Sequence, residues 1–128
     1  MGIRVHGLVA LCLVAFCGCA KREKTTAELI ADLKSTSEHD RLVAVRLLPD
    51  RRDDAATVVP ALAEALKDAE GDVRRSAAIG LGSFAEQARE AIPSLKALRK
   101  DHDARVRDAA GKALARIDPG TAPRVSGR

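Results

Sequence analysis

The stretch VRRSAAIGL at residues 73–81 decides the fold, because a similar stretch, VRDAAGKAL, follows at residues 106–114. The two stretches agree at a separation of 33 residues in Val73 and Val106, Arg74 and Arg107, Ala77 and Ala110, and Leu81 and Leu114. Agreement at several positions with one offset is typical of a tandem repeat. The chain is therefore predicted to be built from copies of one structural unit.

The same offset relates the segments that lie before this stretch. Pro60 matches Pro93, and Leu62 matches Leu95. One further step toward the N-terminus places Leu29 on Leu62, Arg41 on Arg74, Ala44 on Ala77 and Leu48 on Leu81. The sequence thus predicts three units.

Apolar residues recur at helical spacing within each unit. Val73, Ala77, Leu81 and Phe84 are separated by four, four and three residues, which places them on one face of a helix. A second apolar stripe precedes this one, so each unit is expected to hold two helices. The preceding stripes are Leu29, Ile30 and Leu33; Val58, Val59, Leu62 and Leu66; and Ile92, Leu95 and Leu98.

Several residues predict where the helices begin and cross. Thr25 and Glu28 have the spacing of a capping box. We expect Gly71-Asp72 to end one helix and cap the next, and Pro60 and Pro93 to lie near helix starts. Close helix crossings are expected at the small residues Ala44, Ala77, Ala110, Gly80 and Gly111.

This pattern resembles the HEAT repeat family, in particular its short bacterial form related to phycobilisome-lyase repeats. The residues that carry the resemblance are Pro60-x-Leu62, Asp72-Val73-Arg74, Ala77 and Leu81, then Pro93-x-Leu95, Val106-Arg107, Ala110 and Leu114. The resemblance implies an all-α fold, a short α-solenoid of about three helix pairs over residues 27–118. Asp40 and Ala27 depart from the Val and Pro of the pattern, which suits a terminal unit that caps the stack.

The N-terminus reads as a targeting segment. Arg4 precedes the apolar run GLVALCLVAF at residues 7–16, which is too short to span a bilayer and suits a signal peptide. The following Gly18-Cys19 resembles the lipobox of bacterial lipoproteins, although Phe16 and Cys17 are unusual there. The resemblance implies a signal peptide at residues 1–18 and lipidation of Cys19. Ordinary cleavage after Ala20 is the alternative.

Two polar segments flank the predicted array. Residues 19–26 are expected to form the lipidated cysteine and a basic tether, and residues 119–128, rich in Pro and Gly, a disordered tail. The expected location is the extracytoplasmic face of a bacterial membrane, in the periplasm or an equivalent compartment. Without Cys12 and Cys17, and with Cys19 acylated, no thiol would remain for redox chemistry.

Composition argues against a nucleic-acid partner. The formal net charge is only +4, and aromatic residues make up 2% of the chain. After loss of the leader only Phe84 remains, and its place in the apolar stripe leaves no ring for base stacking.

Arginines that recur with the repeat are the candidate binding residues. Arg41, Arg74 and Arg107 either form a ladder with acids of the adjacent unit, for which Asp72 and Asp103 are candidates, or face a partner. Arg75, Arg105 and Lys112 would add positive charge nearby, which favours an acidic protein.

No catalytic arrangement is evident in the sequence, so we predict neither an enzyme nor a bound cofactor or metal. His39 and His102 both lie beside acids, at expected turns, but are 63 residues apart. A metal-dependent enzyme or accessory factor using these histidines is the alternative. Deoxyhypusine hydroxylases, a HEAT-like family, hold iron through His-Glu pairs, and the sequence has no His-Glu dipeptide.

The sequence therefore predicts a lipid-anchored, HEAT-like module that binds or scaffolds proteins in the cell envelope. Self-association through stacking of the array stays open, as does a remnant of a longer array without a role of its own.

Overall fold

The repeat stripes fold as paired helices in the computed structural model, which describes residues 22–121. Within these residues the regular structure is helical, with no strand. The α-helices are α1 (Thr26–Asp32), α2 (Glu38–Leu47), α3 (Ala55–Ala65), α4 (Gly71–Phe84), α5 (Ile92–Leu98) and α6 (Ala104–Ile117). Short 3₁₀ helices are η1 (Leu48–Asp50), η2 (Arg52–Asp54), η3 (Ala85–Ala91) and η4 (Pro119–Thr121).

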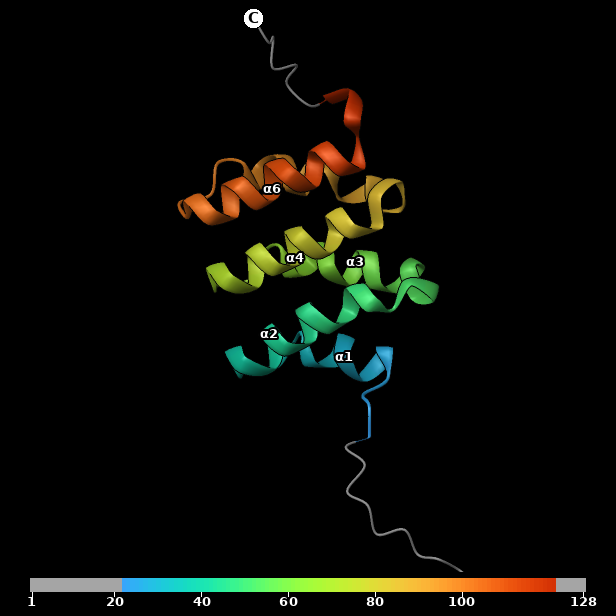
Figure 1. Ribbon diagram of the computed structural model, residues 1–128. Coiled ribbons are helices and arrows are strands. Elements are labelled where there is room, and N and C mark those ends of the chain that lie inside the picture. The colour runs from blue at the N-terminus through green and yellow to red at the C-terminus, as the bar shows by residue number, and fades with distance from the viewer. Residues whose placement is uncertain (1–21, 122–128) are drawn as a thin grey trace, which may run out of the picture.

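The helices form two layers in a short solenoid. Helices α2, α4 and α6 lie side by side in one layer, and α1 and α3 lie behind them (Figure 1). Each unit pairs one helix from each layer, so α1 packs on α2, α3 on α4 and α5 on α6. This arrangement confirms the predicted all-α solenoid of three helix pairs.

The core is made of the residues that share a repeat register. The matched leucines Leu29, Leu62 and Leu95 are fully buried, as are the matched alanines Ala44, Ala77 and Ala110. Phe84 and its counterpart Ile117 are also buried. Because each unit contributes the same positions, the core continues from one unit to the next.

Helix starts follow local capping chemistry, with one exception to the prediction. Thr25 and Glu28 form the predicted capping box of α1: the Glu28 amide donates to Thr25 Oγ1 at 3.3 Å, and the Thr25 amide donates to Glu28 Oε2 at 2.7 Å. Asp103 caps α6 through the Arg105 amide at 2.8 Å. The prediction that Asp72 caps a helix was wrong. Helix α4 already begins at Gly71, which leaves Asp72 inside its first turn.

The two repeated prolines occupy different positions in their helices. Pro93 lies in the first turn of α5, as predicted, whereas Pro60 lies inside α3, which begins at Ala55. In the third unit the residues that match the first turn of α3 belong to the 3₁₀ helix η3, so α5 begins later in the repeat. The expected proximity of Pro60 to a helix start was therefore wrong.

Glycines allow α4 to approach its neighbours closely. A Cβ on Gly80 would lie 2.8 Å from Pro49 Cγ, and a Cβ on Gly82 would lie 3.0 Å from Ala113 Cα. Gly80 therefore has the predicted role. Gly111 does not, because its nearest neighbour is the flexible end of the Arg99 side chain.

Residues 22–25 of the expected tether contact the array. Arg51 donates to the Lys24 carbonyl at 3.0 Å, and Lys24 Nζ donates to Asp32 at 2.6 Å. At the other end the expected tail begins with η4, while residues 122–128 lie outside the described residues. None of the helices in residues 22–121 combines the length and the hydrophobicity needed to cross a bilayer.

Candidate partner-binding face

Arg41 joins the first unit to the second. Its Nε and Nη2 donate to the two carboxylate oxygens of Asp68, at 2.8 and 3.2 Å. Its Nη1 donates to the carbonyls of Ser35 and Thr36, in the turn of its own unit, at 2.9 and 3.3 Å. The planar guanidinium thus closes its own turn and holds the next unit at the same time.

Arg74 repeats this arrangement between the second unit and the third. Its Nε and Nη2 donate to Asp101 at 2.9 and 3.1 Å, and its Nη1 donates to the carbonyls of Asp68 and Ala69, both at 2.8 Å. Both charged side chains are over 90% buried. Hydrogen bonding to Asp101 raises the pKa of Arg74, and hydrogen bonding from Arg74 lowers the pKa of Asp101. We call these two arginine–aspartate pairs the rungs.

The rungs confirm the predicted ladder of arginine–acid pairs between units, but the acids in it are not the predicted ones. Asp68 and Asp101 supply the carboxylates, not the predicted Asp72 and Asp103. Asp103 instead caps α6 and pairs with Arg105 at 3.0 Å, and Asp72 lies 3.4 Å from the same arginine. In each turn between helices the first aspartate, Asp68 or Asp101, pairs with the arginine of the preceding unit, whereas the later one, Asp72 or Asp103, does not.

Arg107 occupies the same register as Arg41 and Arg74 but has no carboxylate partner among residues 22–121. Its Nη1 closes the turn of its own unit, donating to the carbonyls of Asp101 and His102 at 2.7 and 3.0 Å. It forms no ion pair within that part of the chain.

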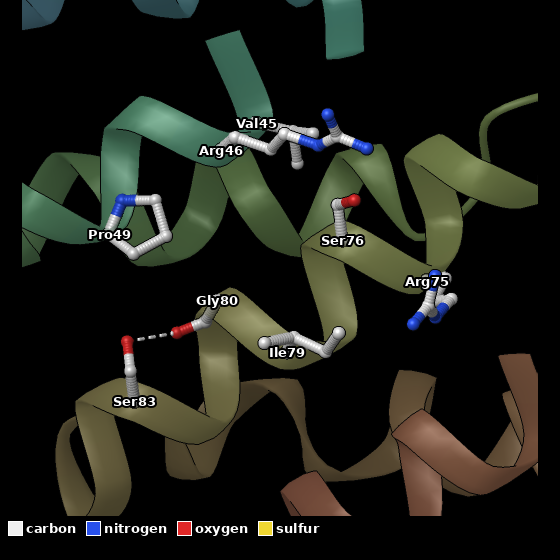
Figure 2. A pocket seen from close by; sticks show the side chains of 8 residues that line it. All are labelled: Val45, Arg46, Pro49, Arg75, Ser76, Ile79, Gly80 and Ser83. Atoms are coloured by element: carbon white, nitrogen blue, oxygen red, sulfur yellow. Dashed lines mark hydrogen bonds between the residues drawn. The ribbon is translucent and has the colours of Figure 1, made fainter. Parts of the chain in front are cut away.

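A different set of side chains lines the exposed side of the α2, α4 and α6 layer. One hollow of about 350 Å³ lies between α2 and α4, and another of about 140 Å³ lies between α4 and α6. Arg75 and Ile79, both on α4, line both hollows. Figure 2 shows the first hollow, with Arg46 of α2 on one side and Ile79 of α4 on the other.

This surface, which we call the α2–α4–α6 face, combines positive charge with an exposed apolar side chain. Ile79 is 49% exposed, one of two large apolar residues that stand out in this way among residues 22–121. The two hollows that it lines are also lined by five cations and one acid, Asp108. The cations are Arg46, Arg75, Arg105, Lys112 and Arg116.

Three of the cations have no acidic partner within the described residues. Lys112 pairs with Asp108 at 2.8 Å, and Arg105 lies near Asp72 and Asp103. Arg46, Arg75 and Arg116 are exposed and form no ion pair in residues 22–121. The face therefore presents positive charge that the array itself does not neutralise.

The structure brings three of the predicted binding residues together on this face, namely Arg75, Arg105 and Lys112. It places Arg41 and Arg74 in the rungs and Arg107 at the outer edge of the third unit. Arg46, Ile79 and Arg116 were not predicted from the sequence. The repeat contained a signal for two of them, because residues 46, 79 and 112 share one register. Partner binding by any of these side chains stays a prediction.

The remaining candidate residues lie apart from this face. His39 is in the first turn of α2 and His102 in the turn before α6, and both are exposed. Among residues 22–121 no group of three or more His, Cys, Asp or Glu side chains is placed to hold a metal ion. Cys19 and the predicted signal peptide lie outside the described residues.

A family model for HEAT repeats matches residues 26–121. The chain belongs to the HEAT repeat family. The matched residues include all six α-helices of the array, and the match confirms the family predicted from the sequence.

A curated protein also resembles part of the chain. An uncharacterised protein of Bacillus subtilis (strain 168), SkfG, is 34% identical over 96 residues, which is 75% of this chain and 54% of the relative. The chain thus spans about half the length of this curated relative.

Two solved structures share the fold. A chain in the complex of CpcE and CpcF of phycocyanin lyase, from Nostoc sp. PCC7120, superposes with a TM-score of 0.67 and is 30% identical, over 74% of this chain and 38% of that one. A crystal structure of an engineered protein superposes with a TM-score of 0.63 at 22% identity, over 74% of this chain and 46% of that one. The second likeness concerns the fold alone.

Proposed function

We propose that this protein is a lipid-anchored protein-interaction module of the bacterial cell envelope, and that it binds an acidic protein through the α2–α4–α6 face. Membership of the HEAT family supports a protein-binding role, and so does the likeness to a chain of a complex between two proteins. We choose this face because Ile79, which lies between its two hollows, is half-exposed and surrounded by cations.

The apolar and the charged residues of this face would contribute to binding in different ways. Burying Ile79 under a partner would remove apolar surface from water, at about 25 cal/mol per Å². The unpaired Arg46, Arg75 and Arg116 would attract an acidic surface and orient it before contact. Arg side chains are also enriched at binding interfaces, because the planar guanidinium accommodates carboxylates well.

The anchor would hold the array by its first unit. Cys19 lies three residues before Arg22, and a fully extended stretch of three residues reaches only about 10 Å. Arg22 itself pairs with Glu28 at 3.1 Å, so the contact with the array begins at once. In this proposal α1 and α2 are the membrane-proximal end, and α5 and α6 are the distal end.

Affinity capture of the full-length chain from its own cells tests the binding proposal. Ile79→Ser should abolish recovery of a partner that the natural chain retains, and the retained partner should be acidic. Leu47→Ser is the matched control, since Leu47 is 44% exposed but lies outside both hollows of the face. Equal recovery with both variants would refute this use of the face.

Mass spectrometry of the N-terminal peptide tests the anchor. An acylated Cys19 in the membrane fraction, lost in Cys19→Ser, is the expected result. An unmodified N-terminus at Lys21 would overturn the anchor and leave the binding proposal standing.

A further inference from the structure

The two rungs show what the guanidinium at this register binds. Arg41 and Arg74 each close their own turn with Nη1 and each present Nε and Nη2 to an aspartate of the following unit. The acids lie 27 residues after their arginines in both cases. Their position is also fixed locally, because Asp68 Oδ1 accepts from the Glu70 amide and Asp101 Oδ1 from the Asp103 amide, both at 2.9 Å.

The third guanidinium has the same support without the acid. Arg107 makes both carbonyl bonds of its own turn, so it is held as Arg41 and Arg74 are. Beside it on α6 and α5 is a hollow of about 400 Å³. That hollow is lined by Arg99, Arg107, Asp108, Gly111, Lys112 and Ala115.

The charge at this end is positive and largely unmatched. Asp108 is the acid in the hollow, and it is engaged by Lys112. Within residues 22–121 no carboxylate pairs with Arg107 or Arg99.

We infer that the α5–α6 end of the array docks another helical-repeat protein, whose inter-helix turn supplies an aspartate to Arg107 as a third rung. This inference rests on the proposed role in protein binding but concerns the α5–α6 end, which has only Asp108 and Lys112 in common with the α2–α4–α6 face. It names the class of partner: a HEAT-like helix pair that carries the aspartate at the start of its turn and a small residue at the helix crossing.

The small residue is required by the way successive units cross. Gly80 of α4 packs against Pro49, and one unit later Ala113 of α6 packs against Gly82. Ala115 has the register of Pro49 and Gly82, and it lines the hollow beside Arg107. A docked unit in the same geometry must therefore place a Gly or Ala against Ala115.

A second copy of this chain does not meet these requirements. Its first unit has Ser35 in the register of Asp68 and Asp101, so it offers a hydroxyl in place of a carboxylate. It has Leu47 in the register of Gly80 and Ala113, where the second and third units carry only a Gly or an Ala at the crossing. These two residues exclude head-to-tail stacking in the register of the array and favour a foreign partner.

The test converts the first unit into the proposed ligand. The probe is the full-length chain with Ser35→Asp, Asp40→Val and Leu47→Ala, which restores at each position the residue type found in the other units. Ser35 Oγ already accepts from the Ser37 amide at 3.1 Å, so an aspartate suits this turn. Asp40→Val also removes a carboxylate that accepts from Ser35 at 3.1 Å and would repel the new one.

Binding of the labelled probe to unlabelled natural chain is measured by fluorescence anisotropy. We expect association that weakens at least about tenfold when the natural chain carries Arg107→Gln, because a charge-assisted pair is lost. A control probe with Ser35→Asn in place of Ser35→Asp should bind as weakly. Circular dichroism establishes that both probes are folded.

Three results would overturn the inference. In the first, the folded probe does not associate with the natural chain. In the second, it associates, but Arg107→Gln does not change the affinity. In the third, the natural chain associates with itself and Arg107→Gln abolishes this self-association. The last would assign the end to a second copy. Because Ile79 lies outside this end, these outcomes are independent of the capture experiment on the α2–α4–α6 face.

Discussion

The Arg74 guanidinium donates two parallel hydrogen bonds, of 2.9 and 3.1 Å, to the Asp101 carboxylate across the boundary between the second unit and the third. Neither side chain is more than 9% exposed. The remaining Arg74 donors close the turn that carries Asp68, which is itself the acid of the preceding rung. Each rung therefore supports the next, and a three-unit array gains stability from contacts between neighbours.

Arg74→Gln is expected to lower the free energy of unfolding by about 3 kcal/mol, because it leaves the buried Asp101 carboxylate without a cation. Urea denaturation followed by circular dichroism measures the change. Arg75→Gln is the control, since Arg75 is the exposed neighbour on the same helix, and should change stability by less than about 0.5 kcal/mol. Similar losses for both substitutions would show that the rung adds no stability of its own.

The rung also predicts how stability depends on pH. Hydrogen bonding from Arg74 lowers the pKa of Asp101 in the folded state. A lowered folded-state pKa stabilises the fold above the unfolded-state pKa of about 3.9, and this contribution disappears as the pH falls through the folded-state value. Asp101→Asn should therefore lower Tm most at neutral pH, with the gap to the natural chain closing below about pH 4. A constant gap between pH 7 and pH 2.5 would contradict this assignment, and the exposed Asp53→Asn serves as control.

Two glycines on equivalent helices should respond in opposite ways to alanine. Gly80→Ala places a methyl group 2.8 Å from the Pro49 ring and 3.3 Å from Leu62, so it should lower the free energy of unfolding by about 1–3 kcal/mol. In Gly111→Ala the nearest atom belongs to the end of the Arg99 side chain, which can move aside. That substitution should raise stability by up to about 1 kcal/mol through helix propensity. Thermal unfolding of both variants checks the pair, and a stabilising Gly80→Ala would refute the close crossing at Gly80.

The core was predictable from the sequence because burial follows the repeat. Positions that pack between helices largely recur at the repeat spacing, so one offset identified the matched leucines and alanines that are fully buried. Thr25 and Glu28 were predictable for a different reason. A capping box depends on spacing within a single turn, and here that geometry forms as expected.

The rung acids and the centre of the face were harder to predict. Which aspartate meets Arg74 depends on the path of the turn after α5, and that path brings Asp101 rather than Asp103 against the preceding unit. Ile79 lies two residues from both Ala77 and Leu81, which places it opposite the apolar stripe of α4, but an isoleucine at such a position does not by itself indicate a binding surface. Its exposure follows from the arrangement of residues 22–121, in which no further helix layer covers this side of α4.

Arginine footprinting of the full-length chain, alone and with the captured partner, tests whether the α2–α4–α6 face is the binding surface. Phenylglyoxal modifies exposed guanidinium groups, and mass spectrometry reports the extent at each residue. We expect the partner to protect Arg46, Arg75 and Arg116 and to leave Arg89, which is exposed on η3, as reactive as before. Protection of Arg89 with Arg46, Arg75 and Arg116 still reactive would contradict the assignment of the α2–α4–α6 face as the binding surface.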